Sequence, residues 1–193
     1  RPGRCNGIVL EIGDGITQIF PCIGGYPIKT GMNKYPIGGR DISEYLMKKF
    51  DSSDLHGKNH LKDFSIIKEK YCRVALDYQN ERSLIEPISF TYNDHQFTIG
   101  TEQIDAPEIL FHPNEVSGFE YGIHILLYNA IRECNPSIQK NLYEKVIISG
   151  GIAGMKGLDK RLEKELKLLA PDEVINVYAL PNSSESSWKG ASK

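Results

Sequence analysis

The sequence predicts an α/β fold in which a core lobe is interrupted by an insert that mixes helices with a small hairpin. Short β-rich runs open the chain, helical patterns and a small hairpin fill its middle, and the order helix, strand, helix, strand closes it. This change of pattern places the insert at residues 38–117, between the core segments 1–37 and 118–193. With 193 residues, 40% of them hydrophobic, the chain is long enough for two lobes that share a core.

The opening segment is predicted to form a β-hairpin. Two β-rich runs, residues 7–12 and 16–20, flank Gly13-Asp14-Gly15, and Asp-Gly favours a tight turn because glycine tolerates positive φ. Pro21 argues against a longer central strand. Residues 25–30 are expected to add a third strand, so that the sheet begins as a meander.

The insert is predicted to contain two helices and a hairpin. The first helix follows Gly38-Gly39, and the second spans residues 61–77. The apolar stripe of the second helix consists of Phe64, Ile67, Tyr71, Val74 and Ala75. Its charged residues are expected on the outer face: Lys62, Lys68, Glu69 and Lys70. Alternation over residues 88–99 predicts a hairpin that turns at Asn93-Asp94.

The closing segment is predicted to alternate helices with buried strands. The apolar run 146–148 suits a strand buried on both faces, and Ser149-Gly150-Gly151 turns it into the next helix. A last strand is expected at residues 174–178. Helices are expected at residues 119–134 and 137–143. The helix after the Ser149-Gly150-Gly151 turn is expected to end at Pro171 and to have a leucine stripe as its core face: Leu158, Leu162, Leu166 and Leu169.

Charge, apolar runs and cysteines argue against several kinds of partner. The net charge is -2 and the sequence pI ≈ 6.2, so no global field points to nucleic acid or an anionic membrane. The apolar stretches are far shorter than the roughly 20 residues that span a bilayer, and no signal peptide opens the chain. The four cysteines form no C-x-x-C pair, so reduced thiols are expected rather than a zinc site. The start at Arg1, without an initiator methionine, suggests a piece of a longer protein.

The first predicted turn has the composition of a phosphate-binding loop. Successive free N–H groups in Gly13-Asp14-Gly15 would form a concavity suited to phosphate oxygens. Asp14 and Glu11 would hold a hydrated divalent cation, and Gln18 would orient a water molecule for in-line attack. A plain surface hairpin explains the same residues and, taken alone, is the preferred explanation.

Two further segments carry weaker signals. Ser149-Gly150-Gly151 lies at the carboxyl end of a buried strand, the position at which ligands of open α/β sheets bind. A tight strand-to-helix turn without a ligand would have the same sequence pattern. Lys68-Glu69 lies on a predicted helix, and a solvated charged face explains this pair equally well.

Together these signals resemble the actin family, and the similarity extends over nearly the whole chain. The segments that carry it are residues 7–15 (GIVLEIGDG), 39–42 (GRDI), 67–72 (IKEKYC), 74–77 (VALD), 106–111 (APEILF), 122–124 (GIH) and 149–151 (SGG). The resemblance implies a ribonuclease H-like actin ATPase domain, a mixed sheet with helices, that carries an inserted smaller subdomain. The core segments resemble subdomain 3 of actin, and the insert resembles subdomain 4.

In actins, ATP and a divalent cation occupy the cleft between two such domains. The resemblance covers the second domain only, so ATP or ADP with Mg²⁺ or Ca²⁺ is expected as cofactor in the full-length protein. No bound cofactor is expected in this fragment, because half of the phosphate and metal contacts would be missing. A weak ATPase at most is expected of the full-length protein, and an inactive fragment.

The resemblance also implies roles for individual residues. The phosphate contacts would come from Gly13, Asp14, Gly15 and Ile16. The adenosine contacts would come from Gly39, Lys68, Glu69, Gly150, Gly151, Ile152 and Met155. The catalytic set would be Asp14, Glu11 and Gln18, of which Glu11 and Asp14 would hold the metal through water.

Several positions depart from the actin pattern. Glu11 replaces an aspartate, Gln18 a histidine and Met155 a tyrosine. Ser65 and Ser184 replace an arginine and a lysine of the nucleotide cleft, and each lost charge-assisted contact is typically worth roughly 1.5–3 kcal/mol. These departures indicate a divergent actin or an actin-related protein.

The leading functional hypothesis is an actin-like, ATP-binding cytoskeletal protein whose nucleotide state controls assembly. Its partners would be its own missing first domain and other actin-like subunits or a multiprotein assembly, with neither nucleic acid nor membrane. It would be cytoplasmic, with a nuclear location as the alternative.

A second hypothesis is a non-filament actin-related protein that acts as a structural subunit of a capping or chromatin-remodelling complex. The polar loop 114–119, with Glu115 where actin is apolar, argues weakly for it. A third, a sugar kinase or chaperone-type ATPase, is disfavoured by the actin-like GRD and IKEK segments.

Overall fold

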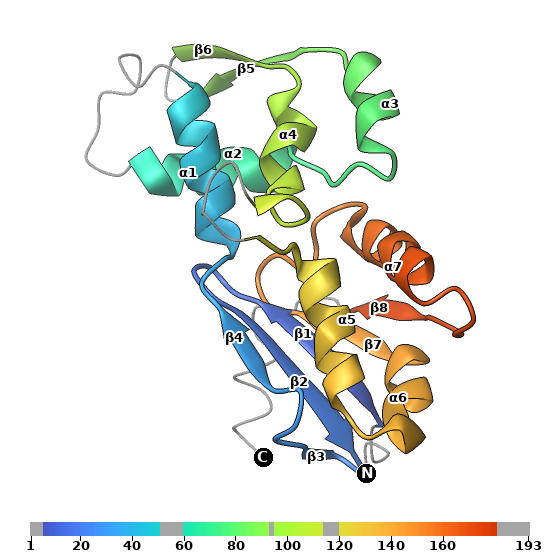
Figure 1. Ribbon diagram of the computed structural model, residues 1–193. Helices are drawn as coiled ribbons and strands as arrows, with labels where there is room; N and C mark the ends of the chain where they lie inside the picture. Colours follow the sequence, from blue (N-terminus) through green and yellow to red (C-terminus); the bar gives the residue numbers. More distant parts are fainter. Residues whose placement is uncertain (1–5, 51–59, 93–94, 114–119, 181–193) are drawn as a thin grey trace.

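In the computed structural model the chain forms two stacked lobes, with residues 6–50, 60–92, 95–113 and 120–180 described (Figure 1). The lower lobe of Figure 1 is a mixed sheet with α5, α6 and α7, and the upper lobe holds α1 to α4 with a small hairpin. None of the described helices is long and apolar enough to cross a membrane. The predicted α/β class is confirmed, whereas the exact domain boundaries at residues 38 and 117 stay a prediction.

The sheet of the lower lobe combines antiparallel and parallel pairs. Its strands follow the order β3-β2-β1-β7-β8, with β4 paired to β2. β1 is antiparallel to β2 but parallel to β7, which is parallel to β8. The strands are β1 Gly7–Ile12, β2 Thr17–Ile23, β3 Tyr26–Pro27, β4 Asn33–Tyr35, β7 Val146–Ser149 and β8 Val177–Ala179. The predicted meander is present, but its third strand is only two residues long and β4 was not predicted.

Three helices pack with this sheet: α5 Ile123–Glu133, α6 Pro136–Tyr143 and α7 Leu158–Leu169. α6 begins where it does because Asn135 accepts a hydrogen bond from the Ser137 N–H at 3.0 Å and Pro136 fits the first helical turn. Alternate residues of β1 differ in burial, since Leu10 is fully buried whereas Val9 is half-buried. Ile147 of β7 is half-buried too, so the prediction that this strand is buried on both faces was wrong at that residue.

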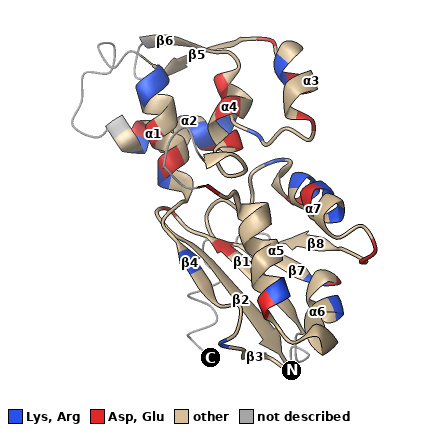
Figure 2. Cartoon of the chain, viewed as in Figure 1, with Lys and Arg blue, Asp and Glu red and all other residues tan. Residues whose placement is uncertain are grey.

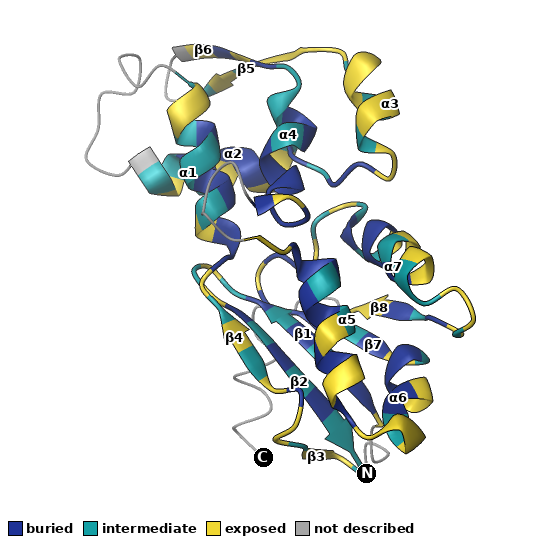
Figure 3. Ribbon diagram, viewed as in Figure 1, coloured by how far each residue is buried: buried dark blue, intermediate teal, exposed yellow. Residues whose placement is uncertain are grey.

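The upper lobe contains four helices and a two-stranded sheet. Stacked rings connect α2 to the hairpin: the centroids of Tyr71 and Phe90 are 4.2 Å apart, and those of Phe90 and Phe97 are 5.6 Å apart. The elements are α1 Gly39–Lys49, α2 His60–Tyr71, α3 Tyr78–Ser83, β5 Ile88–Tyr92, β6 His95–Ile99 and α4 Glu102–Glu108. The hairpin was predicted, although its turn at Asn93-Asp94 lies outside the described residues. Figure 3 shows α3 largely exposed, and none of its residues is buried.

The helix predicted over residues 61–77 was too long, because tertiary hydrogen bonds draw the chain out of the helix after Tyr71. The Arg73 N–H donates to the Gln103 carbonyl at 3.0 Å, and the Val74 N–H donates to the Lys156 carbonyl at 2.9 Å. Val74 is buried as predicted, but it lies beyond the end of the helix.

Other element boundaries and two helices also differ from the sequence-based expectation. The side chain of Asp77 caps α3 by accepting from the Asn80 N–H. Neither α3 nor α4 was predicted; α4 contains Pro107, a residue that in sequence argues against a helix interior. The helix expected from residue 119 begins at Ile123 in the described part of the chain, with Gly122 as its N-cap.

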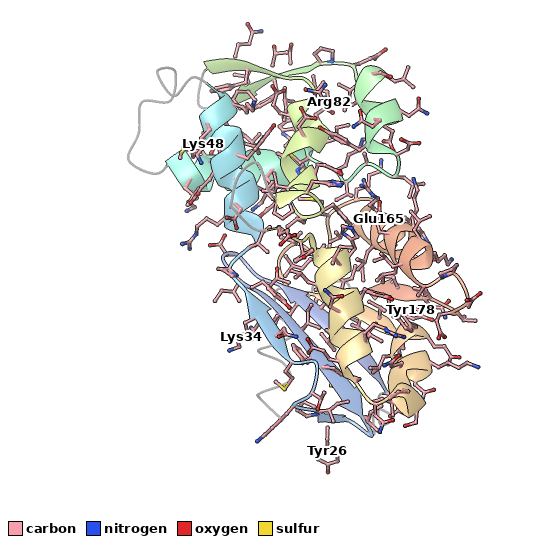
Figure 4. The ribbon with its side chains drawn as sticks, in the orientation of Figure 1. Tyr26, Lys34, Lys48, Arg82, Glu165 and Tyr178 are labelled. Carbon is pink, nitrogen blue, oxygen red and sulfur yellow. The ribbon has the colours of Figure 1, made fainter. Side chains whose placement is uncertain are left out.

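A buried ion pair joins the two lobes. Arg161 of α7 donates to the Glu108 carboxylate of α4 from Nη2 at 2.9 Å and from Nη1 at 3.2 Å. The side chains of Arg161 and Glu108 are 5% and 7% exposed. Arg161 also donates from Nε to Glu165 at 2.6 Å, and Figure 4 labels Glu165 on α7 at this junction. The sequence analysis assigned no role to these residues.

His124 of α5 is buried beside this ion pair. Its burial is expected to make the stability of the chain depend on pH. Burial lowers the pKa of His124 to about 4; the charge of Glu165 opposes this shift, and those of His112 and Arg161 add to it. Its Nδ1 has no hydrogen-bond partner within the described part of the chain. The unfolded chain therefore binds a proton near pH 6.5 that the folded chain takes up only near pH 4.

We expect the free energy of unfolding to fall as the pH is lowered from 6.5 towards 4. Above pH 6.5, His124 should not change the free energy of unfolding. Urea unfolding across the range measures the slope. His124→Asn should flatten it, whereas His112→Asn, which removes only a minor cause of the lowered pKa of His124, should reduce the slope slightly. A slope that survives in His124→Asn would assign it to other groups.

Candidate functional site

The turn between β1 and β2 lies against the first residues of α1. The Gly13 N–H donates to the Ile16 carbonyl at 2.9 Å and closes the turn. From α1, the Gly39 N–H donates to the Gly13 carbonyl at 2.9 Å and the Arg40 N–H to the Asp14 carbonyl at 2.6 Å. The carbonyl oxygens of the turn are thus held by the helix, while the N–H groups of residues 14–16 have no acceptor in the described chain. This arrangement leaves amides available for an anion.

The predicted backbone of this turn was partly wrong. Neither Gly13 nor Gly15 has a positive φ, so the turn does not depend on the left-handed region. A Cβ built at Gly15 would meet no atom within 4 Å, whereas one at Gly38 would lie 2.6 Å from the Gly13 and Asp14 carbonyl oxygens. Gly38 is therefore the glycine that permits the close approach of turn and helix, and the sequence analysis gave it no such role.

Arg40 pairs with the predicted metal-binding carboxylate. Its Nε and Nη2 donate to Asp14 Oδ2 at 3.0 Å and 2.7 Å, and both side chains are more than half exposed. An exposed pair of this kind contributes roughly 0–1 kcal/mol to stability, so it can be exchanged for another partner at low cost. Arg40 lies in the actin-like GRDI segment, but nothing in the spacing showed that it would reach Asp14.

A first cavity, of about 510 Å³, opens beside this turn. Glu11 pairs across the sheet with Gln18 on one side and with Ser149 on the other, so these three side chains share one face. The strands of the lower sheet carry two charged residues, Glu11 and Lys34 (Figure 2). The cavity is lined by Glu11, Gly13, Asp14, Gly15, Ile16, Gln18 and Arg40. The structure thus brings the predicted catalytic set and the phosphate turn into one space.

The fit to a divalent cation depends on what else supplies ligands. No group of three or more His, Cys, Asp or Glu side chains that could hold a metal occurs in the described ranges of the chain. Two carboxylates, Glu11 and Asp14, line the first cavity, and Asp14 is already bonded to Arg40. Mg²⁺ commonly takes one or two carboxylates and completes its shell with phosphate and water. The residues fit an ion that arrives with a phosphate ligand.

A second cavity, of about 610 Å³, lies between the two lobes. The upper lobe contributes residues 68–73, Ile88 and Gln103, and the lower lobe contributes Gly151, Ile152, Gly154, Met155 and Lys156. Five of the residues predicted to contact adenosine are among them: Lys68, Glu69, Gly151, Ile152 and Met155. Met155, which replaces a tyrosine of the actin pattern, therefore lines the wall of this cavity. Ser65 of α2 does not line it, and Ser184 and Glu115 lie outside the described residues.

Lys68 is buried, which corrects the expectation that it lies on the outer face of α2. Its side chain donates from Nζ to the Gly39 carbonyl at 2.8 Å, and the residue is 3% exposed. Burial lowers the pKa of Lys68, while the charges of Asp14 and Glu69 raise it. Since the Gly39 N–H also bonds the Gly13 carbonyl, Gly39 connects the ammonium of the second cavity to the turn of the first. Glu69 is exposed, as expected.

Gly150 is required by backbone geometry, whereas Gly39 lies close to two side-chain ends. A Cβ at Gly39 would lie 2.8 Å from Ile152 Cδ1 and 3.1 Å from Lys68 Nζ. Gly150 has φ +91°, and its Cβ would lie 2.2 Å from the Ile12 carbonyl oxygen. These two residues shape the walls of the site and line neither cavity themselves.

Further wall residues of the second cavity escaped the sequence analysis. Lys70, Arg73 and Lys156 add positive charge, although Arg73 is paired with Glu81. Burial raises the pKa of the Cys72 thiol to about 12, so this cysteine is a protonated wall residue. Only the tertiary fold brings Lys156 opposite α2, and no local pattern could have indicated this.

Comparison with known proteins matches the chain to one family over its whole length. The family described as Actin matches residues 1–66 and 59–193. Centractin of Schizosaccharomyces pombe is 34% identical over 198 residues, which cover 98% of this chain and 52% of that protein. Actin-like protein 7A of Mus musculus is 29% identical over 195 residues, which cover 98% and 44%. The chain spans about half the length of these relatives.

Proposed function

This chain belongs to the actin family, and on that premise we propose that it forms one half of an ATP clamp in an actin-like cytoskeletal protein. The phosphates of ATP or ADP would lie in the first cavity and the adenosine in the second. The other half of the clamp would be a partner domain, consistent with a chain that spans about half of its relatives. Nucleotide state would then control assembly with other actin-like subunits.

The observation that carries this proposal is the position of the Lys68 ammonium. It is buried and, among the described residues, donates one hydrogen bond, to the Gly39 carbonyl, whereas an ammonium has three donors. Through Gly39 it lies next to the turn whose N–H groups are available to an anion. A buried cation beside open backbone amides favours a phosphate-containing ligand over a neutral one.

The residues of the first cavity would act on the phosphates. Gly15 and Ile16 would donate N–H groups to phosphate oxygens, and Glu11 and Asp14 would bind the water shell of Mg²⁺ or Ca²⁺. The ion, when bound, would neutralise phosphate charge. Gln18, on the same face as Glu11, would orient a water molecule. With half of the contacts in the partner domain, the chain by itself should show no ATPase above background.

The Arg40–Asp14 pair favours a second candidate function. It engages the carboxylate that a cation would use, as expected if the pocket serves mainly for folding. In that case the protein would be a non-filament actin-related subunit of a larger complex. Salt-induced pelleting of the full-length protein is expected for a filament former, and its absence together with stable complex formation would favour the alternative.

Ligand-observed NMR with ATP and Mg²⁺ tests the proposed site on this chain. Half of the contacts belong to the partner domain, so this chain should not retain a stably bound nucleotide, but the contacts it does provide should give weak, saturable binding at millimolar nucleotide. Lys68→Met should weaken this binding at least about tenfold, the value of one charge-assisted contact. Lys62→Met, at an exposed position on the same helix, is the matched control and should bind like the parent chain. The proposal fails if no saturable binding appears, or if both lysine variants bind alike.

A further inference from the structure

The second cavity has walls from different lobes, so its width depends on how the lobes are held together. On the lower lobe the wall is residues 151–156, and on the upper lobe it is residues 68–73. These segments meet just beyond the cavity, where the Val74 N–H donates to the Lys156 carbonyl at 2.9 Å. Gly157, with φ +87°, allows this contact, because a Cβ there would lie 2.3 Å from the Val74 carbonyl oxygen.

α7 begins directly after the lower wall, residues 151–156. Side chains of α7 donate hydrogen bonds to carbonyl groups of the segment that follows the upper wall. The Arg161 N–H donates to the Gly157 carbonyl at 2.9 Å, so the Arg161 side chain projects from the first turn of the helix. Its Nη1 donates to the Ala75 carbonyl at 2.8 Å. One turn further on, Lys164 Nζ donates to the Leu76 carbonyl at 2.8 Å. The segment 74–76, which follows the upper wall, is thus bound to α7, which follows the lower wall.

The guanidinium of Arg161 connects three elements at once. It bonds Glu108 at the end of α4, the Ala75 carbonyl and Glu165 of its own helix, and it lies 4.7 Å from the centre of the Phe111 ring. A planar fork with five donors suits this arrangement, and a single ammonium cannot reproduce it. No residue of this cluster lines the second cavity.

We propose that Arg161 is a positioning residue that sets the separation of the two walls of the second cavity and thereby its affinity for nucleotide. It acts through Glu108 and Ala75, without contact to the ligand. The effect on affinity rests on the proposed nucleotide site, whereas the effect on the walls does not. A purely structural role would change stability and leave the geometry of the cavity in the folded chain unchanged.

The double variant Arg161→Met/Glu108→Leu separates these roles. Exchanging both partners of a buried ion pair for apolar residues is often neutral for stability, so its melting temperature should stay close to that of the parent chain. We expect ATP with Mg²⁺ to bind roughly tenfold more weakly by ligand-observed NMR. NMR-detected hydrogen exchange of the Val74 amide should be faster by about the same factor, while amides of β1 stay unchanged.

The matched control is Lys167→Met/Glu163→Leu, which removes an ion pair formed within the same helix. It should alter neither ATP binding nor Val74 exchange. If the first double variant does not fold, Arg161→Lys keeps the charge but lacks the fork, and it should show the same two changes.

The outcomes distinguish this inference from the proposed function. If the parent chain binds no nucleotide, the proposed function fails, and Val74 exchange alone decides whether Arg161 positions the walls. If the parent chain binds nucleotide and the variant binds it equally well, the positioning role is wrong, whatever the exchange rate. Unchanged Val74 exchange in a folded variant also overturns it.

Discussion

Replacing Glu108 alone with leucine is expected to lower the free energy of unfolding by about 3–5 kcal/mol. The change leaves the charged Arg161 side chain, which is 5% exposed, without its main partner. Burial opposes the charge, but the bonds to Glu108 and Glu165 more than compensate and raise the pKa of Arg161 above its ordinary value. Since an arginine stays protonated, the buried charge cannot be removed by titration. The remaining bond to Glu165 at 2.6 Å favours the lower end of this range.

Urea unfolding of the single and double variants measures this effect. Adding Arg161→Met to Glu108→Leu should restore most of the lost stability, because the two residues form one interacting unit. Glu163→Leu, which removes a partly exposed ion pair of α7, is the control and should cost at most about 1 kcal/mol. If Glu108→Leu proves as mild as this control, the pair does not hold the lobes together.

Replacing Gly150 with alanine is expected to cost roughly 2–5 kcal/mol, the sum of left-handed strain and overpacking. The residue has φ +91°, and the new methyl carbon would lie 2.2 Å from the Ile12 carbonyl oxygen. Because Ile12 is the last residue of β1, relief of this clash would move the strand that carries Glu11. Loss of stability should therefore be accompanied by weaker nucleotide binding.

The adjacent Gly151→Ala provides a sharp control. A Cβ at Gly151 meets nothing within 4 Å, and its φ is not positive, so thermal unfolding should show no loss of stability. Equal destabilisation by the two substitutions would contradict the described geometry of this turn.

Local patterns predicted most elements of the lower lobe, although not β4. The β-rich run 7–12, the apolar run at 146–148 and the leucine stripe before Pro171 each correspond to an element of the structure, because strand and helix have fixed periods. Burial followed less closely, since Ile147 is only half-buried. The actin-like segments placed the residues that the structure gathers around two cavities. What local patterns missed were features decided by partners far away in sequence. The helix after residue 61 ends at Tyr71 because Gln103 and Lys156 accept the next hydrogen bonds, and neither is near in the chain.

The sequence by itself determined the fold class, the family resemblance and the position of the glycine turns in the chain, since each depends on residues close together in the chain or on motif order. The tertiary structure decided which charges are buried. The sequence placed the neighbours Lys68 and Glu69 on a solvated helix face. Lys68 is instead buried, because Gly39 has no side chain and its carbonyl accepts a hydrogen bond from the ammonium. Arg161 and Glu108, 53 residues apart, had no recognisable role until the lobes placed them within 2.9 Å of each other. Desolvation and pairing depend on the surroundings in space, and these exist only once the chain has folded.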